Sequence, residues 1–297
     1  VDNKGWTSLI SSAFTNLTKK ENTKKTSKFG LFKNKTANKN CFVLDFHGDI
    51  KATEVQQLRE EISTLLTVAQ AEDEVIVRLE SSGGMVHAYG LAAAQLARIK
   101  EAGLNLTVCI DKVAASGGYM MACVADKILA APFAVVGSIG VVAQVPNFHD
   151  LLEKHDIDVE VFTAGKYKRT VTVFGENTEE DKQKFQQELE ETHKLFKDFV
   201  RKYRPSLDVE QVATGEHWYG EDAITRNLVD ALQTSDSYIL EKMTDSELYA
   251  IQSRQKPTIA QKLGISQAAQ AVVATAIDKL PDTLAKLESA KMPMVKK

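Results

Sequence analysis

An α/β fold with a mainly parallel sheet is predicted from the alternation of two hydrophobic periods. Short apolar runs, typical of buried strands, occur at 42–46, 75–79 and 106–110. Between them, residues 53–70 and 87–100 carry apolar side chains every three or four positions, as amphipathic helices do. Strands that alternate with helices at this spacing form βαβ units, whose strands run parallel. The sequence therefore predicts repeated βαβ units, followed by C-terminal helical segments.

The elements after residue 110 follow from the same periods. A long charged helix is predicted over 178–203, with Thr178 near its N-terminal cap and Pro205 ending it. The region 209–243 is predicted to be rich in helix. The other expected elements are a small-residue helix at 116–125, strands at 127–131, 139–145 and 159–164, and a short helix at 147–155.

One uncharged run, residues 128–145, is long enough to be considered as a membrane span. Pro132 and Gly137 disfavour a helix here, and the valine pairs at 135–136 and 141–142 favour strands. Buried parallel strands also form continuous apolar runs. We therefore predict strand, loop and strand inside the core, and no membrane span in this chain.

Composition is that of an ordinary globular protein, with 26% charged and 43% hydrophobic residues among 297. The three cysteines, Cys41, Cys109 and Cys123, form no C-x-x-C pair, which fits neither a disulfide framework nor a zinc site. We interpret them as small buried residues in a reducing compartment. No metal and no cofactor is predicted.

The N-terminal segment 1–40 is strongly basic, with nine lysines against Asp2 and Glu21. It has few large apolar residues and no helical period, so a flexible linker is predicted. A solvated linker, a membrane-side linker attracted to anionic lipid and a nucleic-acid arm all have this composition. The segment does not interleave aromatic with basic residues, so nucleic acid is not expected as a partner.

Two glycine-rich turns follow two neighbouring predicted strands, at 80–84 and 114–118. Each would open a helix at the carboxyl edge of the sheet, where ligands bind in parallel α/β folds. The start of a helix presents unpaired backbone N–H groups, which is what an oxyanion needs. Ser116 begins the second helix. A plain N-cap serine would look the same, so the turns alone do not make Ser116 a nucleophile.

A nucleophilic serine needs a base to remove its proton. Of the six histidines, only His87 is near the predicted site in sequence, and no acidic residue stands out to orient it. A lysine can serve instead if it is desolvated. Lys166 and Lys168 follow the last predicted strand, although such a cluster of cationic residues is more often a solvated loop.

The sequence resembles the signal peptide peptidase A family, most closely its shorter SohB-type inner-membrane members. The resemblance covers roughly residues 41–240. Its motifs occur in family order: Glu80-Ser81-Ser82-Gly83-Gly84-Met85-Val86-His87, Asp111-Lys112-Val113-Ala114-Ala115-Ser116-Gly117-Gly118-Tyr119, Gly137-Ser138-Ile139-Gly140-Val141, Ala164-Gly165-Lys166-Tyr167-Lys168-Arg169 and Thr214-Gly215-Glu216-His217-Trp218-Tyr219-Gly220.

The resemblance implies a role for each matching residue. Ser116 matches the nucleophile, Lys168 the general base, and Ser138 a serine that hydrogen-bonds the base. The N–H groups of Gly84 and Gly117 match the oxyanion hole. The family usually has proline where Ser82 stands, so this turn is expected to be less rigid.

The resemblance also implies a Clp protease/crotonase-like fold and a serine endopeptidase that hydrolyses peptides, such as cleaved signal peptides, through a seryl acyl-enzyme. Members are homo-oligomers in which the lysine of one subunit can serve the serine of its neighbour. They are anchored in the bacterial inner membrane with the catalytic domain outside the bilayer, and the anchor is absent from this chain, which is expected to be soluble.

Three domains are expected from these observations: a basic juxtamembrane-type linker (1–40), a peptidase domain (41–240) and a peripheral helical tail (241–297).

Two alternatives to a peptidase remain. A crotonase-like acyl-CoA enzyme would share the oxyanion hole, but it needs neither the serine that opens the helix nor the lysine. A catalytically inactive assembly subunit would share the fold, but Ser116, Ser138 and Lys168 are intact.

Overall fold

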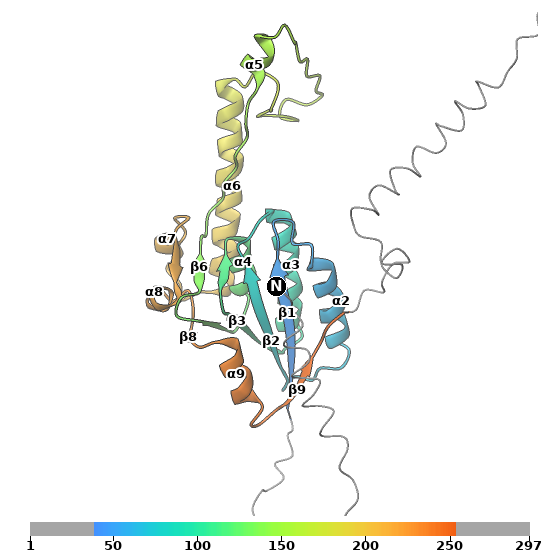
Figure 1. Cartoon of the computed structure of the whole chain (residues 1–297), viewed down its shortest axis with the longest axis vertical. Helices are drawn as coiled ribbons and strands as arrows, with labels where there is room; N and C mark the ends of the chain where they lie inside the picture. Colours follow the sequence, from blue (N-terminus) through green and yellow to red (C-terminus); the bar gives the residue numbers. More distant parts are fainter. Residues whose placement is uncertain (1–38, 254–297) are drawn as a thin grey trace, which may run out of the picture. The chain divides into compact units, whose positions relative to one another are not determined.

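The computed structural model describes residues 39–253 (Figure 1). The predicted basic linker lies almost wholly outside these residues, as does most of the predicted C-terminal tail. The described residues hold the predicted peptidase domain (41–240) and the first residues of the predicted tail, which add a strand at Glu247–Ala250 to the sheet.

A single sheet organises the described residues, and its strands run in the order β7-β6-β4-β2-β3-β5-β8, with β1 beside β2 and β9 beside β1. All described pairs are parallel except β6 with β7. The strands are β1 (Asn40–Gly48), β2 (Glu74–Ser81), β3 (Asn105–Ile110), β4 (Val113–Ala115), β5 (Lys127–Ala130), β6 (Val135–Gly137), β7 (His217–Tyr219), β8 (Ala231–Leu232) and β9 (Glu247–Ala250).

Helices connect these strands as the hydrophobic periods predict. The βαβ units β1-α2-β2 and β2-α3-β3 both join parallel neighbours, so the predicted α/β fold with repeated βαβ units is confirmed. The helices are α2 (Val55–Leu65), α3 (Val86–Glu101), α4 (Gly117–Ala122), α5 (His149–Glu153), α6 (Glu179–Tyr203), α7 (Val209–Val212), α8 (Gly220–Thr225) and α9 (Ser235–Lys242).

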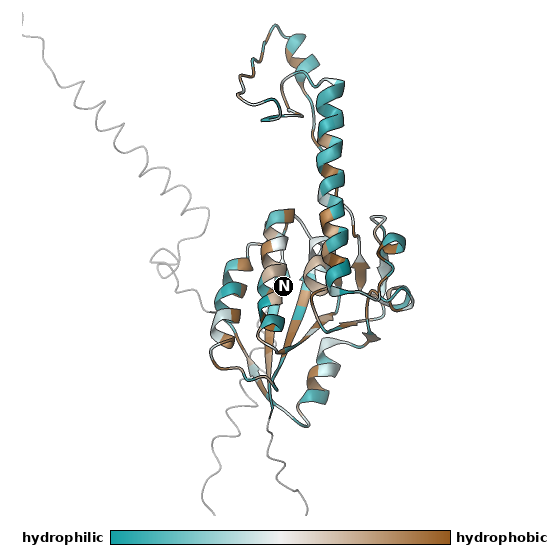
Figure 2. Cartoon of the chain, turned by 180° about the vertical axis from the view of Figure 1, so that it is seen from behind, coloured by the Kyte–Doolittle hydropathy of each residue, from teal (hydrophilic) through white to brown (hydrophobic). Residues whose placement is uncertain are grey.

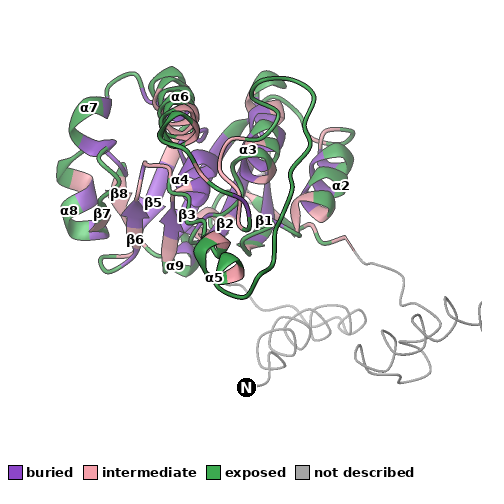
Figure 3. Cartoon of the chain, turned by 90° about the horizontal axis from the view of Figure 1, so that it is seen from above, coloured by how far each residue is buried: buried purple, intermediate pink, exposed green. Residues whose placement is uncertain are grey.

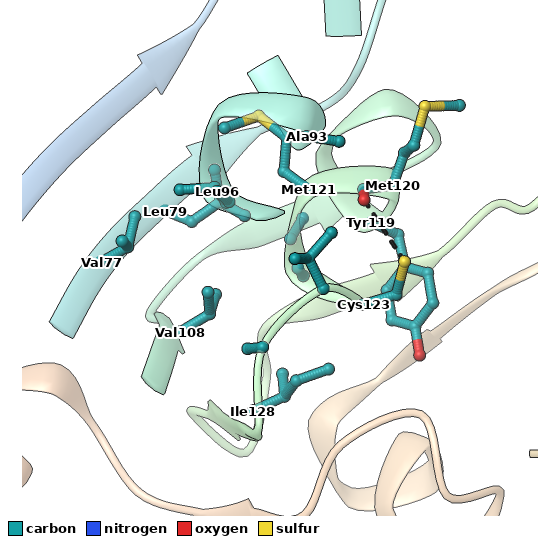
Figure 4. Close-up of a cluster of buried hydrophobic side chains, with 14 of the residues drawn as sticks. Val77, Leu79, Ala93, Leu96, Val108, Tyr119, Met120, Met121, Cys123 and Ile128 are labelled. Carbon is teal, nitrogen blue, oxygen red and sulfur yellow. Dashed lines mark hydrogen bonds between the residues drawn. The ribbon is translucent and has the colours of Figure 1, made fainter. Parts of the chain in front are cut away.

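The main core lies between one face of the sheet and helices α2, α3 and α4. Every residue of α4 is buried, because the helix is short and made of small and apolar residues. Figure 4 shows this cluster, in which Tyr119, Met121 and Cys123 lie beside Leu96 of α3 and Val108 of β3. The helix that follows Ser116 is therefore held by packing along its whole length.

The long helix α6 is mostly solvated. Phe196 and Val200 are its buried residues, and the rest of its surface is largely hydrophilic (Figure 2). Its start is set by a capping box between Thr178 and Asp181. At its other end Arg204 pairs with Asp230, which joins the helix to the core. The predicted helix over 178–203 is confirmed.

The strands predicted at 139–145 and 159–164 are wrong. The run 128–145 forms β5 and β6, and the chain from 138 to 148 has no regular secondary structure. In the segment between β6 and α6 most side chains are exposed (Figure 3), including Val142 at 91% and Phe162 at 88%. Its apolar pattern resembles that of a buried strand, but the sheet of this chain does not cover it. Among residues 39–253 no helix has both the length and the apolar character needed to cross a membrane.

The cysteines are free and buried, as the sequence predicts. Burial raises the pKa of Cys41 and of Cys109 to about 12, so both thiols stay protonated at neutral pH. We expect iodoacetamide at pH 8 to leave all three cysteines unmodified in the folded chain and to modify all three in denaturant, as read by intact mass. Rapid modification of the folded chain would contradict this burial.

Candidate active site

Three neighbouring strands end together at one edge of the sheet. Ser81 of β2 is paired with Ala114 of β4, and Ala115 of β4 is paired with Gly137 of β6. The strands are parallel, so the residues that follow them lie at the same edge. The first glycine turn, Ser116 and Ser138 are therefore next to one another, as predicted for the two turns.

Ser116 has an unusual backbone conformation. Its φ is 51° and its ψ −117°, which non-glycine residues rarely adopt. Hydrogen bonds hold it there: its N–H donates to the Gly137 carbonyl at 2.8 Å, and its carbonyl accepts from the Met120 N–H at 2.9 Å. Its side chain makes no capping hydrogen bond to α4. Ser116 is thus not a plain N-cap, and backbone strain of this kind is often found at functional sites.

The two glycine turns are in direct contact. A Cβ added to Gly83, whose φ is +88°, would lie 2.6 Å from the Gly117 nitrogen. The Gly83 N–H donates to Ser81 Oγ at 3.0 Å, and the Met85 N–H donates to the Ile50 carbonyl at 2.8 Å. Within residues 39–253 the N–H groups of Gly84 and Gly117 have no acceptor. Two unpaired donors therefore lie close to Ser116.

A small pocket gathers these groups. Ser116, Gly84 and Gly117 all line it, and most of the remaining wall is apolar. Thr192 and Phe196 come from α6, which brings the long helix to the site. The other lining residues are Val86, Met120, Gly140 and Val141.

Ser138 lies one position beyond the carbonyl that holds Ser116. Its φ is 51°, equal to that of Ser116, and its N–H donates to the Glu216 carbonyl at 2.6 Å. Because Ala115 and Gly137 are register partners, the two serines follow equivalent positions of neighbouring strands. The structure thus brings Ser116, Ser138, Gly84 and Gly117 together.

Lys168 is not brought to this pocket within the single chain. Its side chain is exposed, in a segment held against the first turns of α6 by Lys166, which pairs with Glu180 at 2.8 Å. Thr192, which lines the pocket, lies about 18 Å farther along the helix axis at 1.5 Å per residue. The apolar surroundings expected for Lys168 are absent from its exposed position in this chain.

The structure adds contacts of residues to which no role could be assigned from the sequence. Ser81 and Tyr89 hydrogen-bond to each other beside the glycine turns, and His193 Nε2 lies 3.3 Å from the Ile139 carbonyl. Thr192 also reaches the site from α6. Phe196, which also lines the pocket, could be expected to face inward, because it continues the apolar period of the predicted helix over 178–203. The others depend on how α3 and α6 pack.

One cluster of possible metal ligands occurs on α5. One side-chain ligand atom each of His149, Asp150 and Glu153 lies within 4.8 Å of the others. The two carboxylates are exposed, and exposed acidic groups of this kind are common without an ion. This cluster is separate from the pocket at Ser116.

The α/β fold and a strained serine beside two unpaired N–H groups are features expected of an α/β peptidase. The model of peptidase family S49 matches residues 98–249, and that of its N-terminal region matches 7–96. This chain belongs to peptidase family S49.

Similar proteins include two named "Probable protease SohB". The protein of Haemophilus influenzae is 65% identical over 223 residues, covering 75% of this chain and 63% of that protein. The protein of Buchnera aphidicola from Acyrthosiphon pisum is 58% identical over 218 residues, covering 73% and 65%. The matches thus span less than two thirds of either relative.

Among solved structures, a mutant of the 1510-N membrane-bound stomatin-specific protease has 11% identity and a TM-score of 0.47. The matched region covers 73% of this chain and 99% of that protease. A second mutant of the same protease, in complex with a substrate peptide, has 13% identity and a TM-score of 0.44, covering 77% and 97%.

Proposed function

We propose that this chain is the catalytic part of a serine endopeptidase, with Ser116 as nucleophile and Lys168 as general base. The observation that carries the proposal is the conformation of Ser116 beside two unpaired N–H groups. The relatives named as proteases support it. As in the family that the motifs resemble, the expected reaction is acyl transfer.

The residues supply the steps of this reaction. Ser116 Oγ attacks the peptide carbonyl, and the oxyanion accepts hydrogen bonds from the Gly84 and Gly117 N–H groups. Lys168 takes the Ser116 proton and returns it to the leaving amine. Water, activated by the same amine, then hydrolyses the seryl ester. In this proposal Ser138 positions the lysine by a hydrogen bond.

We further propose that Lys168 acts on the Ser116 of a neighbouring copy in a homo-oligomer. The Lys168 segment is tied to α6 far from the pocket of its own chain. The same region exposes several large apolar side chains, among them Val142, Phe162 and Phe174. A second copy covering them would supply the dry surroundings that a lysine base needs.

The substrates we propose are peptides with apolar side chains, such as cleaved signal peptides. The support is the apolar wall formed by Val86, Met120, Val141 and Phe196 beside Ser116. A site at the bacterial inner membrane belongs to the same proposal.

Mixing two inactive variants tests the shared site. We expect Ser116→Ala and Lys168→Ala each to abolish peptide hydrolysis, because each removes one partner of the proton transfer. When the two variants are refolded together, or exchange subunits after mixing, the mixture should regain a measurable fraction of wild-type activity. Some subunit interfaces then join an intact Ser116 to an intact Lys168. Hydrolysis of a fluorogenic peptide is the measurement.

Lys182→Ala is the matched control, because it removes an exposed lysine of α6 whose surface ion pair with Glu179 contributes little. It should retain near wild-type activity. A fluorophosphonate probe should label the wild type and fail to label Ser116→Ala. Labelling that survives Ser116→Ala would refute the nucleophile, and a mixture without activity would refute the sharing of Lys168 between copies.

A further inference from the structure

A buried pair of hydroxyl groups contacts both glycine turns. Tyr89, in the first turn of α3, is 0% exposed, and Ser81, at the end of β2, is 2% exposed. Their hydroxyl oxygens are hydrogen-bonded to each other. We propose that Ser81 and Tyr89 are positioning residues that hold both N–H donors of the oxyanion hole, an inference that rests on the proposed function.

The direction of each proton in this pair follows from its partners. The Tyr89 hydroxyl donates to the Asp49 carbonyl at 2.7 Å, which uses its only proton. Burial raises the pKa of Tyr89, so that proton stays in place. With the Tyr89 proton used, the Ser81 hydroxyl proton is the one left for the Ser81–Tyr89 contact, which is shorter than the 3.2 Å from Ser81 Oγ to its other acceptor, the Gly48 carbonyl. The Ser81 oxygen accepts the Gly83 N–H at 3.0 Å.

This chain of hydrogen bonds fixes the first turn. Ser81 occupies the N–H of Gly83, and the Ile50 carbonyl occupies that of Met85, so the Gly84 N–H is the one left for a ligand. Without Ser81 Oγ, the Gly83 N–H would be a buried donor without a partner, and the peptide group would rotate to find one. Rotation of that group moves the Gly84 donor as well.

The second turn is fixed by the same two residues. A Cβ at Gly117 would collide with the Tyr89 ring, so the ring lies directly against the backbone that carries the second donor. A Cβ at Gly118 would collide with the Ser81 carbonyl oxygen. One tyrosine thus contacts the Gly117 backbone with its ring and supports the Gly83–Gly84 turn through its hydroxyl.

Steady-state kinetics of Ser81→Ala, Tyr89→Phe and the double variant test the inference. We expect each single variant to lower kcat by about 10- to 100-fold, less than the loss of a whole donor, with KM changed by less than about 3-fold. The double variant should fall no further than the worse single variant, because both act through one chain of hydrogen bonds. In hydrogen exchange, the Gly83 amide should lose protection in both single variants.

Tyr119→Phe is the matched control. It also removes a fully buried tyrosine hydroxyl that donates to a backbone carbonyl, that of Leu228, but away from the turns. Its melting temperature should fall as in Tyr89→Phe, while its kcat stays within about 2-fold of wild type. If Ser81→Ala does not fold, the kcat of Tyr89→Phe alone tests the inference. This variant keeps the aromatic ring packed against Gly117 and loses only the hydroxyl group.

Two results would overturn the inference while leaving the proposed function intact. One is an unchanged kcat in folded Ser81→Ala and Tyr89→Phe. The other is an equal loss of kcat in Tyr119→Phe, which would make the effect a general one of lost stability. A wild-type chain that neither hydrolyses peptide nor reacts with fluorophosphonate at Ser116 would instead overturn the proposed function, and the positioning role with it.

Discussion

Replacing Ser116 with alanine is expected to lower kcat by about 10⁴-fold or more, because the attacking oxygen is lost and only residual catalysis by the oxyanion hole remains. Alanine at a φ of 51° carries the same backbone strain, so the melting temperature should change little. Ser116→Gly should be equally inactive and more stable by about 1 kcal/mol, because glycine adopts this conformation without strain. Kinetics and thermal melts of both variants provide the measurement.

Ser206→Ala is the control for these variants, since Ser206 is an exposed serine in the turn after α6. It should match the wild type in both activity and melting temperature. Residual hydrolysis above about 1% in Ser116→Ala, after removal of contaminating proteases, would rule out Ser116 as the nucleophile.

Gly83→Ala is expected to have the second largest effect. Its added Cβ would lie 2.6 Å from the Gly117 nitrogen and 2.8 Å from Ser116 Cβ, so the two turns must separate. The φ of +88° adds a strain of about 1–2 kcal/mol. Displacing an oxyanion donor should lower kcat by about 10²- to 10³-fold.

Gly103→Ala separates strain from collision. Gly103 has a similar φ of +79°, but an added Cβ meets no atom within 4 Å. It should lose about the same stability through strain and keep its kcat. Urea unfolding and peptide hydrolysis measure the two effects. Equal kcat in Gly83→Ala and wild type would mean that contact between the turns does not matter for catalysis.

Much of this architecture is encoded locally. The strands at β1, β2 and β3 and the helix α6 follow from hydrophobic period, capping and the position of Pro205, all of which act over a few residues. The two glycine turns could be assigned to one edge of the sheet because parallel strands bring their carboxyl ends together.

Other features depend on contacts that no local pattern records. Residues 139–145 are as apolar as a buried strand, yet Val142 is exposed, because an apolar pattern does not say which surface covers it. The bond between Ser81 and Tyr89 needs the packing of α3 on β2. The exposure of Lys168 follows from where the segment before α6 is held, through Lys166 and Glu180.

The pairing of β6 with β7 has a consequence for how the protein is made. β6 carries the carbonyl that holds Ser116, and its outer neighbour is β7, where Gly137 is paired with His217. The Ser138 N–H likewise depends on Glu216. During translation, Ser116 therefore leaves the ribosome roughly a hundred residues before the strand that completes its support, an interval of about 5–20 s. A nascent chain that ends before β7 should hold a folded βαβ core but a Ser116 without its full backbone support, so reaction of Ser116 with a fluorophosphonate should wait until β7 has been made.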